Sequence, residues 1–178
     1  MHNKKTRLFV IVGALLIVLL GIGWGVVKRL STIAPMGLSE QKNNDFSERS
    51  RSLHTLPDGQ MARLRIGQSP LTVEVAASPA SQTKGLSERD AIGSDGMLFV
   101  FSQPNYYRFW MKNMRFDLDF VWIADAVVVD ITPNVPHPDD SGFLPTFGPP
   151  VPVDAMLEVP AGYAQQQGWA VGAAVSLE

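Results

Sequence analysis

The fold is decided by residues 118–132, which read Leu118-Asp119-Phe120-Val121-Trp122-Ile123-Ala124-Asp125-Ala126-Val127-Val128-Val129-Asp130-Ile131-Thr132. Two runs of β-branched and aromatic residues, typical of strands, flank a short polar break. We therefore expect strands over Leu118–Ile123 and Val127–Thr132, with a hairpin turn at Asp125-Ala126.

Similar short runs extend outward on both sides. Ser78 and Pro79 favour the start of a helix that runs through Lys84 and stops near Gly85. A second short helix is expected between Ala161 and Gln167. The other expected strands are Met61–Ile66, Leu71–Val75, Met97–Phe101, Arg108–Lys112, Ala155–Val159 and Ala173–Leu177. Many short strands predict a mainly β domain over residues 61–178, either a small barrel or a two-sheet sandwich, with two short helices.

A proline-rich segment interrupts this pattern. Residues 133–152 hold 7 of the 13 prolines, which excludes a central strand or helix there because proline lacks an amide donor and fixes φ. We expect one long loop, and loops of that length are more often functional or mobile than scaffold.

The N-terminus predicts a membrane anchor. Leu8 to Val27 is a run of 20 uncharged residues, long enough as a helix to cross a bilayer. It is longer than the apolar core of a secretory signal and lacks a small-residue cleavage site, which favours an uncleaved anchor over residues 1–30. The positive charge before this run is slightly greater than the charge after it, which favours a cytoplasmic N-terminus. We therefore expect the domain to lie outside the cytoplasm.

Residues 31–60 are rich in polar and charged side chains and lack apolar periodicity. They predict a flexible tether between the anchor and the domain.

Composition narrows the function. The chain has 178 residues and no cysteine, which excludes disulfide bonds and sites that need a thiolate. Its formal net charge of -2 gives no case for nucleic-acid binding. Residues 61–178 hold 7 basic and 13 acidic residues, which disfavours polyanionic ligands.

Residues 70–178 contain four ordered motifs, which are Lys84-Gly85-Leu86-Ser87-Glu88-Arg89, Gly96-Met97-Leu98-Phe99-Val100-Phe101, Phe109-Trp110-Met111-Lys112-Asn113 with Leu118-Asp119, and Leu157-Glu158-Val159-Pro160-Ala161-Gly162. Together they resemble the domain of unknown function 192 family, a small bacterial and archaeal domain that is often exported or membrane-anchored. Ser87 stands where the family usually has Met, and Met114 where Thr is usual. The resemblance implies a compact, mainly β domain and brings no settled activity with it.

Strand alternation places Trp110 and Lys112 on one face, with Phe109 and Met111 facing the core. The exposed pair could form a ligand platform of one aromatic ring and one cation, or a half-buried Trp covered by the Lys stem. Asn113 and Arg89 are the other candidate ligand-binding residues. Arg89 also suits a structural salt bridge near a helix end.

Asp119 and Glu158 each interrupt an apolar strand. Burial of a carboxylate is unfavourable unless it is paired or hydrogen-bonded, so we expect a structural polar network with Arg89 or Lys112 as the cationic partner. The alternative is a general acid and base with shifted pKa values.

No metal or cofactor site is predicted. His137-Pro138-Asp139-Asp140 could bind a metal from a loop, but a solvated turn explains it better. Motifs for a nucleophile elbow, a phosphate-binding glycine loop and a zinc protease are absent.

The sequence thus predicts a membrane-tethered extracytoplasmic binding or accessory domain, whose partner is an unknown small molecule or an envelope protein. Two alternatives are a hydrolase of envelope carbohydrate that uses Asp119 and Glu158, and a scaffold for a protein partner.

Overall fold

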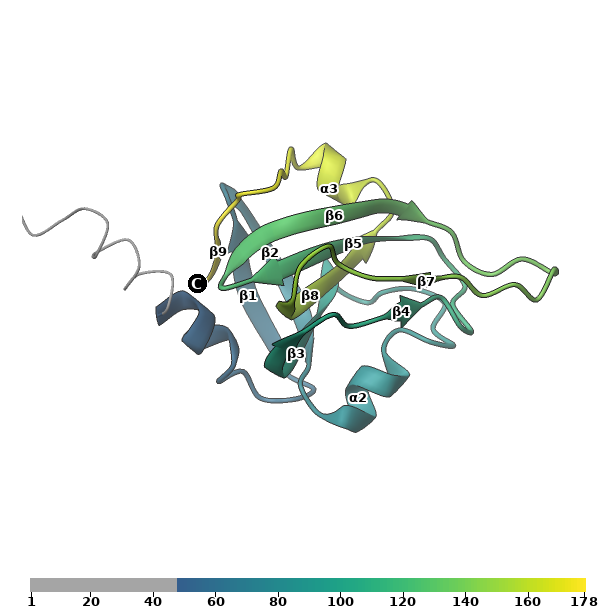
Figure 1. Ribbon diagram of the computed structural model, residues 1–178, viewed down its shortest axis with the longest axis horizontal. Coiled ribbons are helices and arrows are strands. Elements are labelled where there is room, and N and C mark those ends of the chain that lie inside the picture. The colour runs from purple at the N-terminus through teal and green to yellow at the C-terminus, as the bar shows by residue number, and fades with distance from the viewer. Residues whose placement is uncertain (1–47) are drawn as a thin grey trace, which may run out of the picture. The chain divides into compact units, whose positions relative to one another are not determined.

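The computed structural model describes residues 48–178 (Figure 1). The predicted anchor and residues 31–47 of the predicted tether lie outside the described residues. Within residues 48–178, none of the helices is long and apolar enough to span a bilayer.

The domain is mainly β, as predicted. Its strands are β1 (Met61–Ile66), β2 (Ser69–Ala76), β3 (Gly96–Asn105), β4 (Phe109–Trp110), β5 (Leu118–Ala124), β6 (Val127–Val135), β7 (Thr146–Phe147), β8 (Val153–Pro160) and β9 (Val175–Leu177). Its labelled helices are α2 (Pro79–Lys84) and α3 (Tyr163–Gln166). Both helices and the turn at Asp125-Ala126, where both residues have positive φ, confirm the sequence prediction.

Seven strands form one curled sheet in the order β6-β5-β8-β3-β2-β1-β9. All neighbours are antiparallel except β2 and β3, whose parallel pairing requires the crossover that contains α2. The two edges of the sheet approach each other, since Val127 bridges Ala174 and the Val128 N–H donates to the carbonyl of Ala173 at 2.9 Å. The result is a curled half-barrel (Figure 1) rather than a two-sheet sandwich.

The sheet separates two apolar clusters. The inner cluster lies inside the curl and takes alternate residues such as Val121, Ile123 and Leu157. The outer cluster takes the opposite residues, such as Phe120, Trp122 and Met156. The outer face is partly covered by the small sheet β4-β7, which contributes Phe109 and Phe147. Strand alternation therefore decides to which cluster each side chain belongs.

The predicted boundary of the tether at residue 60 lies too far along the chain. Residues 48–53 form a third short helix, and Leu53 is only 1% exposed within the inner cluster. The Ser50 hydroxyl donates to the Asp154 carboxylate on β8 at 2.9 Å. Contacts such as these hold the segment to the sheet, and they produce no periodicity in a polar sequence.

The Pro-rich loop also contains more regular structure than expected. The predicted strand Arg108–Lys112 is confirmed only at Phe109–Trp110, and its partner β7 lies inside the loop. β6 continues through Pro133 to Val135. Proline is tolerated there because β6 is an edge strand of the large sheet.

Candidate functional site

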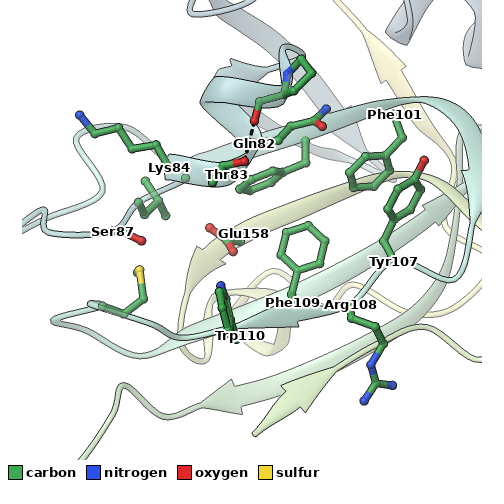
Figure 2. A pocket seen from close by; sticks show the side chains of 15 residues that line it. Gln82, Thr83, Lys84, Ser87, Phe101, Tyr107, Arg108, Phe109, Trp110 and Glu158 are labelled. Atoms are coloured by element: carbon green, nitrogen blue, oxygen red, sulfur yellow. Dashed lines mark hydrogen bonds between the residues drawn. The ribbon is translucent and has the colours of Figure 1, made fainter. Parts of the chain in front are cut away.

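A pocket of about 420 Å³ opens on the outer face of the curled sheet. It lies between α2 with its following turn on one side and β4 on the other, and Glu158 lies at its floor (Figure 2). The lining residues are Pro79, Gln82, Thr83, Lys84, Gly85, Leu86, Ser87, Phe99, Phe101, Tyr107, Arg108, Phe109, Trp110, Met114 and Glu158.

Local sequence builds the wall formed by α2. Ser78 caps the helix by accepting the Ser81 N–H, and Pro79 occupies the first turn. The helix stops at Gly85, which has a φ of 49°. A Cβ at Gly85 would lie 3.3 Å from Cζ of Phe99, so glycine lets the turn approach the aromatic wall closely.

Aromatic rings form most of the opposite wall. Phe101 stacks on Tyr107 with ring centroids 3.7 Å apart, and Phe99 meets Phe109 edge to face at 5.1 Å. These rings come from one stretch of chain, residues 99–110, in which aromatic residues are concentrated. Strand alternation assigns Phe109 to the core and does not identify Phe99, Phe101 and Tyr107 as site residues, although this concentration of aromatic residues is visible in the sequence.

Glu158 reaches the pocket because of its register. It lies opposite Phe120 on β5 and Met97 on β3, so it shares the outer face with Met156. It is only 5% exposed, and none of the described residues donates a hydrogen bond to its carboxyl group. Burial therefore raises its pKa from about 4.5 to about 8.

Most of the other polar side chains of the pocket have hydrogen-bond partners. Gln82 donates to the Val100 carbonyl at 2.7 Å, Thr83 to Pro79 at 2.7 Å and Ser87 to Lys112 at 3.0 Å. Tyr107 donates to the Gln103 carbonyl, and Arg108 to Thr146. Lys84 points out of the pocket in Figure 2. Glu158 is thus the acidic group left to face a ligand, since the hydroxyls donate to other partners.

Asp119 does not belong to this pocket. It lies opposite Val159 rather than Glu158 and therefore faces the inner side of the sheet. Fully buried, it accepts three backbone N–H groups, from Asn134 at 2.8 Å, Gly162 at 3.0 Å and Ala164 at 3.0 Å. The predicted burial is confirmed, but the donors are backbone amides of β6 and of the start of α3 and not a cation.

Arg89, the expected partner of these acids, pairs elsewhere. Its guanidinium makes two bonds to the Glu74 carboxylate, at 2.6 and 2.9 Å. This pairing lowers the pKa of Glu74 and raises that of Arg89. The prediction that Arg89 pairs with Asp119 or Glu158 is wrong, and the structural salt bridge is the alternative that holds.

The predicted platform lies at the rim of the pocket. Trp110 is 54% exposed and lines the pocket, and the Lys112 Nζ lies 5.3 Å from the centroid of its ring. Lys112 therefore stacks on Trp110 and does not pair with a buried acid. Asn113 is an exposed turn residue with a φ of 57° and is not a lining residue.

His137 pairs with Asp117, its backbone N–H and ring both bonding that carboxylate. This pairing lowers the pKa of Asp117. Residues 48–178 contain no cluster of three or more side chains suited to hold a metal ion.

Residues 62–177 match one family, described as "DUF192: Uncharacterized ACR, COG1430". No curated protein matches the chain. A protein from Sinorhizobium meliloti 1021, described as a "putative transcription regulator", has a crystal structure that is similar with a TM-score of 0.61 and 30% identity, covering 68% of this chain and 97% of that one. A protein of unknown function from Novosphingobium aromaticivorans is similar with a TM-score of 0.59 and 25% identity, covering 70% of this chain and 96% of that one.

Proposed function

This chain belongs to the DUF192 family, whose description assigns no activity, and we propose from its geometry that it is a binding domain for a small organic molecule. The ligand occupies the pocket above Glu158. One observation carries the proposal: a buried carboxyl group without a donor points into a cavity of about 420 Å³. Buried polar groups are nearly always hydrogen-bonded, so an unpaired one that faces a cavity marks a place for a ligand.

The walls support this function. Rigid aromatic rings offer apolar contact area at little entropic cost, and Trp110 stands exposed at the entrance. Pockets that bind small molecules commonly combine apolar walls with a few polar groups that orient the ligand.

The hydrolase alternative receives no support from the same geometry. A glycosidase needs two carboxyl groups across one cleft, about 5–10 Å apart. Asp119 lies on the other face of the sheet and is bonded by three amides, and Glu158 is the one acid among the lining residues. Nor do we propose nucleic-acid binding, because acidic residues outnumber basic ones in residues 61–178.

We further propose that the domain is tethered to a membrane through Leu8–Val27 and lies outside the cytoplasm. The support is the length of the uncharged run and the basic residues beside it. A reporter fused after Leu177 should be active outside the cytoplasm, and the chain should stay with membranes after an alkaline wash. Activity of the reporter in the cytoplasm would overturn the orientation, and a soluble form lacking residues 1–30 would overturn the uncleaved anchor.

Ligand binding can be tested with a variant that fills the pocket. Thr83→Trp places a large ring in the cavity, whereas Thr55→Trp makes the same change at another exposed threonine, outside the pocket. Both hydroxyls bond a nearby backbone carbonyl, so the two changes lose similar local contacts.

The full chain in detergent micelles is screened by thermal shift against sugars, nucleotides, amines and small anions. We expect at least one compound to stabilise the wild type and Thr55→Trp but not Thr83→Trp. A ligand concentration of about a hundred times the dissociation constant should raise the free energy of unfolding by about 2.7 kcal/mol. If no compound shows this dependence on Thr83, the binding function is refuted and the scaffold for a protein partner becomes the better hypothesis.

A further inference from the structure

We propose that the ligand of this pocket is an organic cation, whose ammonium group is held by the Glu158 carboxylate and the surrounding aromatic rings. This inference rests on the proposed binding function and names the class of ligand.

The first support is an acidic side chain at the floor of the pocket that has no cationic partner among the described residues. The protein provides no cation for Glu158, because Arg89 is bonded to Glu74 and Lys112 stacks on Trp110. The two strands that flank Glu158 present only Met97 and Phe120 beside it.

The cations at the edges of the pocket are directed elsewhere. Arg108 bonds Thr146, and Figure 2 shows both Arg108 and Lys84 pointing away from the Glu158 carboxyl group. Tyr107, the other titratable lining residue, donates its hydroxyl to the Gln103 carbonyl. A cationic ligand would therefore meet one carboxyl group without displacing an existing ion pair.

The second support is the chemistry of the walls. Aromatic faces attract cations, most strongly where the site is desolvated. Phe99, Phe101 and Phe109 line the pocket around Glu158, and Trp110 already attracts the Lys112 ammonium group on the rim. An ammonium ion bound here would replace its hydration with ring faces and one carboxylate.

The affinity of the pocket for a cationic ligand should also depend on pH. Glu158 is protonated below a pKa of about 8, so a cation binds with loss of that proton. The apparent affinity for a permanent cation should therefore rise about tenfold per pH unit well below 8 and level off above it. A neutral ligand that accepts a hydrogen bond from the protonated carboxyl group would show the opposite trend.

The experiment compares two probes of nearly the same shape by calorimetry on the full chain in detergent micelles. Choline carries a quaternary ammonium group whose charge does not titrate, and 3,3-dimethyl-1-butanol replaces its nitrogen with carbon. Each is titrated from about pH 6 to about pH 9, in two buffers of different ionisation enthalpy at each pH, which reports proton release. Glu158→Gln removes the charge with little change in shape, and Glu88→Gln makes the same change at an exposed residue outside the pocket.

We expect choline to bind at least about tenfold more tightly than the alcohol, with affinity that rises with pH and a proton released near neutral pH. Glu158→Gln should abolish this preference, whereas Glu88→Gln should retain it. Equal binding of the two probes, or stronger binding of choline at low pH, would overturn the inference.

The failure of this inference can be told from failure of the binding function. If choline does not bind while a neutral compound binds in a manner blocked by Thr83→Trp, the pocket is a ligand site but not for a cation. If no probe depends on Thr83, both proposals are refuted.

Discussion

Replacing Asp119 by Asn should destabilise the domain severely, although the side chain keeps its size. Its carboxylate accepts three backbone N–H groups, two on Oδ1 and one on Oδ2. An Asn carbonyl oxygen can keep the two bonds from Asn134 and Gly162. The new amide nitrogen then faces the Ala164 N–H, a donor opposite a donor, in a fully buried position.

The magnitude follows from these bonds. A buried N–H left without an acceptor costs about 1–3 kcal/mol, and two charge-assisted bonds that become neutral lose several tenths to about 1 kcal/mol each. Together these losses give a decrease of roughly 3 kcal/mol in the free energy of unfolding. For a domain of this size the decrease lowers Tm by roughly 10 °C.

The assay is thermal and urea unfolding of the full chain in micelles, followed by near-ultraviolet circular dichroism. Asp140→Asn is the matched control, because Asp140 is exposed and lies in the Pro-rich loop. We expect it to change stability by less than about 0.5 kcal/mol. If Asp119→Asn is as stable as Asp140→Asn, the three amide bonds do not hold the end of β6 and the start of α3 to Asp119 on β5, and this explanation of the stability is refuted.

Other substitutions test the floor of the pocket, the sheet and the domain boundary. Because the folded pKa of Glu158 (about 8) exceeds its ordinary 4.5, the folded state alone holds this proton between these values. As the pH rises from 4.5 to about 8, the free energy of unfolding of the wild type should therefore fall by up to about 1.4 kcal/mol per pH unit relative to that of Glu158→Gln. Parallel curves of urea midpoint against pH for the two proteins would contradict this. Gly96→Ala should lower the free energy of unfolding, measured in urea, by about 1–3 kcal/mol, because the new Cβ would lie 2.5 Å from the Glu158 carbonyl oxygen. An unchanged urea midpoint would mean that β3 and β8 are not this close. Leu53→Ala should lower unfolding free energy by about 2–4 kcal/mol, whereas a flexible tether through residue 60 predicts no loss. Trp110→Ala should leave Tm almost unchanged but weaken choline binding several-fold; unaltered calorimetric affinity would remove the ring from the site.

The strands and helices were largely predictable because they depend on local pattern. Alternation located β5 and β6 and placed Asp119 on a different face from Phe120, and capping residues located α2. β7 is only two residues long, so it is too short to show a period. Its pairing with β4 depends on a contact between segments distant in sequence.

The partners of the polar residues could not be predicted from the same pattern. Alternation shows that Asp119 and Glu158 are buried, but not which strands become neighbours or in which register. The register places the two acids on opposite faces, and β2 brings Glu74 to Arg89. Backbone amides, which have no sequence signature, satisfy Asp119.

The aromatic pocket likewise depends on tertiary structure. The crossover through α2 and strand β4 line the pocket around Glu158, and neither element suggests a cavity alone. Trp110 was identified as a candidate because its position on the strand left it exposed.

The central claim is that Glu158 is an unpaired, buried acid at the floor of a ligand pocket. It is tested most directly by the carboxyl ¹³C resonance of Glu158 in the full chain, assigned by its absence from Glu158→Gln and followed through a pH titration. The account predicts that this resonance titrates near pH 8, and that choline shifts its midpoint downward. Titration near 4.5, as for an exposed glutamate, would contradict the account.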